Sequence, residues 1–183
     1  MILITGASAS GKTETAKELG VLFGIKKVVT HTTRNKRVGE VDGIDYHFVT
    51  KEEFNQLKTL DAFVETTVYN NNYYGTSKKE IADDKVLVVE TSGARVFLGL
   101  KDEHIMVYRL HASNQTRATR MRNRGDKEED IQKRLINDVT RFADNQLKDD
   151  RIYEIDTEKY DIKGVAEIIY KHYSNYLQQV KNK

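Results

Sequence analysis

Short apolar runs separated by longer amphipathic stretches make up most of the chain. The apolar runs predict strands at residues 2–4, 27–29, 62–68, 86–89, 105–110 and 152–155. Several of them are apolar without alternation, which is typical of parallel strands covered on both faces. The stretches between them predict helices at residues 12–23, 51–57, 77–82, 94–100, 114–122, 128–147 and 163–180. Alternating strands and helices predict an α/β fold with a doubly wound, mostly parallel sheet flanked by helices.

Two polar residues mark expected helix starts. Thr50 is followed three residues later by Glu53, which is a capping-box pattern, and Asp161 can cap the last helix. The acidic run at residues 126–130 also suits the start of a helix, because the helix dipole favours negative charge there.

Residues 33–84 differ in kind from the rest of the chain. Turn residues such as Gly39, Gly43 and the asparagines at 70–72 alternate with short apolar runs and one helical stretch. We therefore expect a small lobe, at about residues 34–83, inserted between two strands of the core. The whole chain, residues 1–183, is then a single domain with its core at 1–33 and 84–183.

Composition excludes some classes of protein. The 183 residues carry 30 Lys and Arg against 28 Asp and Glu, so bulk charge does not indicate nucleic-acid binding. The chain has no cysteine, which excludes disulfides and Cys-based zinc sites and fits a reducing compartment. No export signal or membrane-spanning run is recognisable, so we expect a soluble cytoplasmic protein with no membrane and no nucleic acid among its partners.

A phosphate-binding loop follows the first expected strand. Gly6, Gly11, Lys12 and Thr13 fit G-x-x-x-x-G-K-[ST], and a helical stretch follows at once. Backbone N–H groups of such a loop surround a phosphate, the lysine reaches the β and γ phosphates, and the hydroxyl binds magnesium. A ligand-free turn rich in Ser and Gly is disfavoured by this context. The predicted ATP-binding residues are Gly6, Ala7, Ser8, Ala9, Ser10, Gly11, Lys12 and Thr13, with Thr13 on the metal.

The loop alone leaves the acceptor open, because GTPases, ATPases and small-molecule kinases all use it. The expected lobe narrows the choice. Residues 32–40 read T-T-R-N-K-R-V-G-E, residues 43–48 read G-I-D-Y-H-F, and residues 72–76 read N-Y-Y-G-T. Over most of its length the chain resembles the guanylate kinase family of P-loop nucleoside monophosphate kinases, which shows T-T-R-x-x-R-x-G-E, G-x-D-Y-x-F and N-Y-Y-G-[ST] in this order. The resemblance implies a P-loop kinase fold and Mg²⁺-dependent transfer of the γ-phosphoryl group of ATP to GMP.

Five residues of these three motifs are suited to binding a phosphate monoester. Arg34 and Arg37 supply planar donors for bidentate capture of a phosphate, and Tyr46 and Tyr74 add hydroxyl donors. Glu40 is expected to orient the arginines. Two arginines three residues apart would by themselves more often form a solvated charged surface, so the pocket depends on the resemblance.

Guanine selection needs a carboxylate facing N1–H and N2–H₂ and a hydroxyl facing O6. The resemblance implies these parts for Glu65 and Thr76, with Thr30 at the edge of the pocket. Taken alone, Glu65 is simply a charge on an exposed strand.

The strand at 86–91 ends where the family has D-x-x-G-A. Here Glu90 replaces the aspartate and Ser92 the usual glutamine. The resemblance implies contact between Glu90 and GMP or magnesium-bound water, one methylene further out.

An arginine-rich stretch suggests a lid at about residues 113–146. Alone, such a stretch is more often a charged surface helix, but behind a P-loop, arginines on a closing lid align the nucleotides and neutralise the moving charge. The family lid reads R-L-x-x-R-G and then K-R-L, and Arg120, Arg124 and Arg134 match it, with one residue fewer after Gly125. The resemblance therefore implies a catalytic set of Lys12, Arg34, Arg120, Arg124 and Arg134. The family's N-D pair after the last strand reads Asp156-Thr157 here, so adenine contacts stay unassigned.

Two alternative functions are considered beside phosphoryl transfer to GMP. The first is a P-loop kinase for another small phosphate acceptor; Glu65 and Thr76 argue against it, although dGMP is an expected second acceptor. The second is a guanylate-kinase-like interaction module without catalysis, which typically lacks the P-loop lysine that is present here. GTPase switch motifs are not found, the five histidines have no metal-ligand spacing, and the sequence allows a monomer or a homodimer.

Overall fold

The structure is a computed structural model that describes residues 1–36, 39–69, 71–141 and 148–182. Its centre is a five-stranded sheet in the order β2-β7-β1-β8-β9, and every neighbouring pair is parallel. The strands are β1 (Ile2–Thr5), β2 (Lys26–Lys27), β7 (Lys85–Val88), β8 (Met106–His111) and β9 (Ile152–Asp156). The prediction of an α/β fold with a mostly parallel sheet is confirmed.

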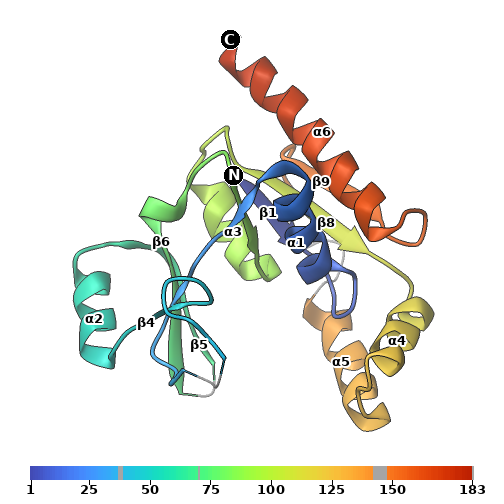
Figure 1. Ribbon diagram of the computed structural model, residues 1–183, viewed down its shortest axis with the longest axis horizontal. Helices are drawn as coiled ribbons and strands as arrows, with labels where there is room; N and C mark the ends of the chain where they lie inside the picture. The colour runs from blue at the N-terminus through green and yellow to red at the C-terminus, as the bar shows by residue number, and fades with distance from the viewer. Residues whose placement is uncertain (37–38, 70, 142–147, 183) are drawn as a thin grey trace.

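Helices cover both faces of this sheet (Figure 1). On one face, α1 (Lys12–Phe23) and α6 (Ile162–Lys181) pack together over Ile2 and Ile4, with Phe23 and Tyr170 stacked at 4.0 Å between ring centroids. On the other face, α3 (Thr91–Gly99) packs over Leu3. Burial on both faces explains why the sequence of β1 is apolar without alternation.

A second, smaller sheet carries the strands of the inserted lobe. Its order is β4-β3-β6-β5, with β3 (His31–Thr32), β4 (His47–Phe48), β5 (Phe63–Tyr69) and β6 (Asn72–Ser77). Helix α2 (Lys51–Thr59) packs on it through Phe54, whose ring stacks on Phe63 at 4.6 Å between centroids. Gly75 is required beneath this pair, because a Cβ there would lie 2.9 Å from Phe63 and 3.0 Å from Phe54. The sheet begins at His31, three residues before the expected start of the lobe.

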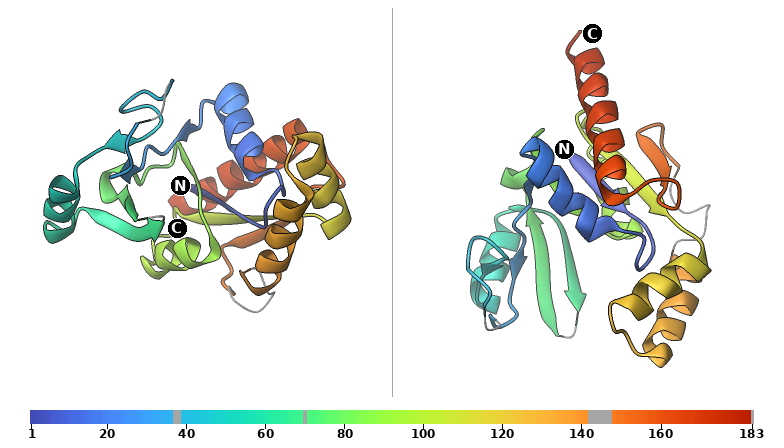
Figure 2. Two further views of the ribbon diagram at one scale, coloured as in Figure 1. Left: turned by 90° about the horizontal axis from the view of Figure 1, so that it is seen from below. Right: turned by 45° about the vertical axis from the view of Figure 1, so that its right-hand side comes forward.

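Two helices form the region expected to be the lid. They are α4 (Asn114–Asn123) and α5 (Glu128–Arg141), and Ala118, Met121 and Ile131 are buried between them. In Figures 1 and 2 this pair extends from the same side of the central sheet as the smaller sheet does, with the end of β1 and the start of α1 between them. The two expected substrate-binding regions therefore flank the P-loop.

Most predicted helix starts are confirmed. Thr50 and Glu53 form the capping box, with Glu53 N–H donating to Thr50 Oγ1 and Thr50 N–H to the Glu53 carboxylate. Asp161 caps α6 by accepting from Gly164 N–H at 2.7 Å. Helix α5 begins in the acidic run, as expected, and the part of the predicted helix at 142–147 lies outside the described residues.

Two helix predictions need correction. The helix predicted at 77–82 is only a single 3₁₀ turn, η1 (Lys78–Glu80), because β6 stays paired with β5 as far as Ser77. Helix α3 begins at Thr91 instead of residue 94, which makes Glu90 its N-cap residue. Within the described ranges, no helix is long and apolar enough to cross a membrane.

Candidate functional site

The P-loop, residues 6–13, turns the chain from β1 into α1. Gly6 has φ +142°, and a Cβ there would lie 2.1 Å from the Leu110 carbonyl oxygen, so no other residue fits. Gly11 has φ +98° at the N-cap of α1, which places the helix N-terminus behind the loop. The loop therefore combines inward-turning peptides with the positive end of a helix, as an anion site requires.

The side chain of Lys12 reaches across this loop. Its Nζ donates to the Ala7 carbonyl at 2.8 Å. Burial lowers the pKa of Lys12 to about 8, and the carboxylates of Asp138 and Glu90 partly oppose that shift. An anion placed in the loop would favour the charged ammonium, so a phosphate and Lys12 stabilise each other.

A cavity of about 500 Å³ brings the P-loop and the lid arginines together. Its lining includes Lys12, Thr13, Arg120 and Arg124, which the sequence analysis assigned to phosphate and metal binding. The remaining described residues that line it are Ala9, Gly11, Glu14, Tyr160, Asp161 and Ile162. Glu14, Tyr160, Asp161 and Ile162 were not predicted from the sequence to belong to the site, and the only signal for any of them was the helix cap at Asp161.

The lid arginines already have protein partners. Arg120 donates from Nη1 and Nη2 to the side chain and carbonyl of Thr157, at 3.0 and 2.8 Å. Arg124 and Arg134 both bind Asp126, at 2.5 and 2.9 Å. Arg124 and Arg134 are each about half exposed, so these ion pairs cost little to exchange for a phosphate.

In the lobe, four of the residues expected to hold a phosphate lie together. Arg34 Nη2 donates to Glu40 Oε1 at 2.7 Å, and both side chains are largely buried. The Arg34 guanidinium lies 5.5 Å from the centroid of the Tyr46 ring, which in turn lies 6.1 Å from that of Tyr74. The hydrogen bond with Glu40 raises the pKa of Arg34. Arg37, the fifth expected member, falls outside the described residues.

Glu65 and Thr76 face each other across β5 and β6. Thr76 Oγ1 donates to Glu65 Oε1 at 2.7 Å, and Thr76 is almost fully buried. Burial raises the pKa of Glu65, while the hydrogen bond from Thr76 opposes the shift. Thr30 precedes β3, and its carbonyl accepts from His47 N–H at 2.9 Å. The carboxylate and the hydroxyl that were expected to select guanine thus share a hydrogen bond.

The residues present fit a magnesium ion that is delivered with a nucleotide. Thr13 lines the cavity, and Glu90, at the end of the segment after β7, is close enough to raise the pKa of Lys12. Magnesium usually keeps several waters and takes only one or two protein ligands besides phosphate oxygens. In the described part of the chain, no three His, Cys, Asp or Glu side chains are grouped to hold an ion alone. Thr13 would bind Mg²⁺ directly, and Glu90 would contact it only through a bound water.

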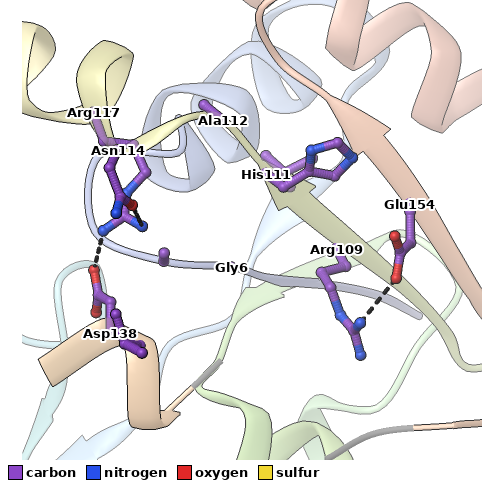
Figure 3. A pocket seen from close by; sticks show the side chains of 11 residues that line it. Gly6, Arg109, His111, Ala112, Asn114, Arg117, Asp138 and Glu154 are labelled. Carbon is purple, nitrogen blue, oxygen red and sulfur yellow. Dashed lines mark hydrogen bonds and ion pairs between the residues drawn. The ribbon is translucent and has the colours of Figure 1, made fainter. Parts of the chain in front are cut away.

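A second cavity, of about 410 Å³, is lined in part by Gly6 and Ala7 at the start of the P-loop (Figure 3). Two ion pairs line it: Arg109 with Glu154 on the sheet, and Arg117 with Asp138 between the lid helices. None of these four residues has a function predicted from the sequence. Their partners lie far away in the sequence, so no local pattern announces them.

Comparisons with known proteins agree with this geometry. The family model described as guanylate kinase matches residues 1–171. A guanylate kinase from Neisseria gonorrhoeae is 34% identical over 87% of this chain and 82% of its own length. One from Mycoplasmoides gallisepticum is 34% identical over 94% of this chain and 92% of its own.

A solved structure shows the same arrangement. The crystal structure of guanylate kinase from Anaplasma phagocytophilum superposes with a TM-score of 0.68 at 26% identity, and the match covers 96% of this chain and 84% of that one. Sequence and fold therefore agree over nearly the whole chain, which belongs to the guanylate kinase family of ATP:GMP phosphotransferases.

Proposed function

We propose that this protein transfers the γ-phosphoryl group of ATP to GMP in the presence of Mg²⁺, with ATP at the P-loop and GMP on the smaller sheet. The observation that carries the proposal is two separate clusters of cationic and hydroxyl-bearing side chains, one at the P-loop and one on the smaller sheet. One contains Lys12, Arg120 and Arg124, and the other contains Arg34 with Tyr46. A hydrolase would need only the first.

ATP lies with its phosphates in residues 6–13, where Lys12 and the loop N–H groups meet them. Its adenine extends along the 500 Å³ cavity toward Tyr160, whose half-exposed ring offers a stacking surface. The cavity joins the phosphate end to this aromatic side chain, which supports one continuous nucleotide site.

GMP binds with its phosphate against Arg34, Tyr46 and Tyr74, and Arg37 stays a predicted fourth contact. Glu65 accepts from the N1–H and N2–H₂ groups of guanine, and the Thr76 hydroxyl turns from Glu65 to O6. Adenine offers an acceptor at N1 where guanine has a donor, so AMP would place that acceptor against the half-buried Glu65 carboxylate without a hydrogen bond between them. Thr30 borders this pocket. The same contacts admit dGMP, because none of them involves the ribose.

Transfer is an in-line displacement. An oxygen of the GMP phosphate attacks the γ phosphorus, and the bond from that phosphorus to the bridging oxygen of ADP breaks. The nucleophile is already ionised, so no general base is needed. Lys12, Arg34, Arg120, Arg124 and Arg134 neutralise the charge on the moving group, and a bound Mg²⁺ would neutralise more of it. Closure of the lobe and lid excludes water, which otherwise competes as acceptor.

The complete P-loop with Gly11, Lys12 and Thr13 disfavours a non-catalytic interaction module. The cytoplasmic location, and the choice between monomer and homodimer, stay predictions from the sequence.

The test is ADP production from ATP and Mg²⁺ with GMP, dGMP, AMP, CMP or UMP, using the wild type and Lys12→Ala. We expect strong turnover with GMP, weaker turnover with dGMP, and loss of both in the variant. Absence of stimulation by every monophosphate would overturn the kinase proposal. Equal stimulation by AMP would overturn the assignment of Glu65 and Thr76.

A further inference from the structure

One buried ion pair joins both lid helices to the P-loop. Arg117 of α4 donates from Nη2 to Asp138 Oδ2 of α5 at 2.6 Å, and both side chains are only 7% exposed. Figure 3 shows the pair beside the loop at Gly6. The cost of burying two charges makes such a pair a weak source of stability, since apolar residues of similar volume often serve as well. Its geometry toward the loop gives a better reason for its presence.

Both side chains also bind the backbone of Ser8, at the middle of the loop. Ser8 N–H donates to Asp138 Oδ2 at 2.9 Å, and Arg117 Nε donates to the Ser8 carbonyl at 2.9 Å. The Ser8 hydroxyl adds a longer contact to Asp138 Oδ1 at 3.4 Å. The backbone N–H and carbonyl of Ser8 therefore bind side chains from two different lid helices, α5 and α4.

These two hydrogen bonds fix the orientation of the peptide group between Ser8 and Ala9. All described peptides are trans, so the N–H of Ala9 points opposite to the Ser8 carbonyl and hence away from Arg117. Ala9 has φ +59°, a left-handed conformation that a residue with a Cβ keeps only when its surroundings hold it. Arg120 holds the other side of Ala9 by donating to its carbonyl at 3.3 Å.

We propose that Arg117 and Asp138 are positioning residues that hold the peptide between Ser8 and Ala9 in the orientation that binds ATP phosphate, and so couple ATP binding to the position of the lid. The inference rests on the proposed binding of ATP at residues 6–13. Neither residue touches substrate: both act through the loop backbone.

The pair also keeps the surroundings of Lys12 electrically balanced. Burial lowers the pKa of Lys12, Asp138 raises it, and Arg117 lowers it; Glu90 and Arg124 are the other charges that act on it, with opposite signs. A neutral pair can therefore position the loop without adding net charge beside the lysine.

The first experiment compares KM for ATP and KM for GMP in Asp138→Asn and in Arg117→Met/Asp138→Leu. The first variant keeps the shape but removes the charge; the second replaces the pair by apolar side chains that can pack in the same space. We expect KM for ATP to rise about tenfold or more in both, because misplaced binding groups are costly even when they are present. We expect KM for GMP to stay unchanged.

A matched control removes another lid ion pair. Glu128→Gln breaks the exposed ion pair between Glu128 and Arg122 of the lid helices, and should leave KM for ATP at the wild-type value. Thermal unfolding of the double variant should match that of the wild type. If the double variant had the same KM for ATP as the wild type, the proposal would be overturned, and the ion pair between Arg117 and Asp138 would serve only to fill space in the core of the lid. Wild-type protein without GMP-dependent turnover would instead indicate failure of the proposed function.

A measurement on the unmodified protein remains decisive if the variants do not fold. The Ser8 N–H donates to a buried carboxylate. Hydrogen exchange measured by NMR should therefore be slower at the Ser8 amide than at an unprotected loop amide. Exchange of the Ser8 amide at the rate of an unprotected loop would contradict the contact and with it the proposal.

Discussion

The P-loop and the smaller sheet both bind phosphate in our proposal, but they are built in different ways. The P-loop is made of eight consecutive residues whose backbone does most of the work, and Gly6 and Gly11 allow its shape. The site on the smaller sheet gathers side chains from β5, β6 and the segments around β3 and β4. The shape of the P-loop is set largely by its own consecutive residues, whereas a site made of side chains from several strands depends on strand pairing.

Substitution of Lys12 should have the largest effect on activity, and it should affect the P-loop without affecting the site on the smaller sheet. Lys12→Ala removes the ammonium that faces the phosphates, and we expect kcat/KM to fall by about 10³-fold, as for loss of one preorganised charge in a catalytic site. Binding of GMP, measured by calorimetry without ATP, should be unaffected because the smaller sheet is separate. A parallel loss of GMP affinity would show that the two sites are not independent.

Protonation of His31 in the smaller sheet should lower the stability of the fold at acidic pH. His31 is buried there against His47 and Phe63, and burial lowers its pKa from 6.5 to about 4. The unfolded chain binds a proton on His31 below pH 6.5 and the folded chain does not, so stability falls as pH drops from 6.5 to 4 and levels off below. The loss by pH 4 is about 3 kcal/mol at most.

Thermal unfolding of the wild type and His31→Gln at pH 7, 5.5 and 4 checks this expectation. Carboxylates titrate in the same range, so the informative quantity is the difference between the two proteins. The glutamine variant should lose less stability on acidification. Equal losses would remove His31 as the cause.

Guanine recognition should be separable from ATP binding. Glu65→Gln replaces a charged acceptor by a neutral amide, and we expect KM for GMP to rise about 10- to 100-fold, corresponding to one or two hydrogen bonds to a charged group. KM for ATP should not change, and AMP should become a relatively better acceptor. Steady-state kinetics with both acceptors measures this. A change in KM for ATP alone would place Glu65 on the wrong side of the site.

The smallest effect concerns the frame of the smaller sheet. Thr50→Ala removes the side-chain half of the capping box of α2, which should cost about 1 kcal/mol of stability. Because α2 packs on the sheet through Phe54, far from Lys12 in the chain, kcat should hardly change. Urea unfolding and steady-state rates at pH 7 test both statements, and a large loss of kcat would connect α2 to the chemistry.

The sequence by itself determined the parallel core, the P-loop and most helix starts. These follow from short-range rules: continuous apolar runs, glycines at positions of positive φ, and Thr50 or Asp161 before a helix. The family motifs likewise stand in consecutive residues. The sequence therefore sufficed to identify the family, and it named the site residues that stay predictions.

Tertiary structure decided what depends on distant partners. Pairing of β6 with β5 prevents a helix at 77–82, although local propensity allows one. Tyr160 lines the proposed ATP cavity together with Arg120 and Arg124 only because the folded chain brings these distant segments together. Arg117 and Asp138, 21 residues apart, meet Ser8 more than a hundred residues away. Such contacts have no local signature, because loop closure and packing, not spacing, bring the groups together.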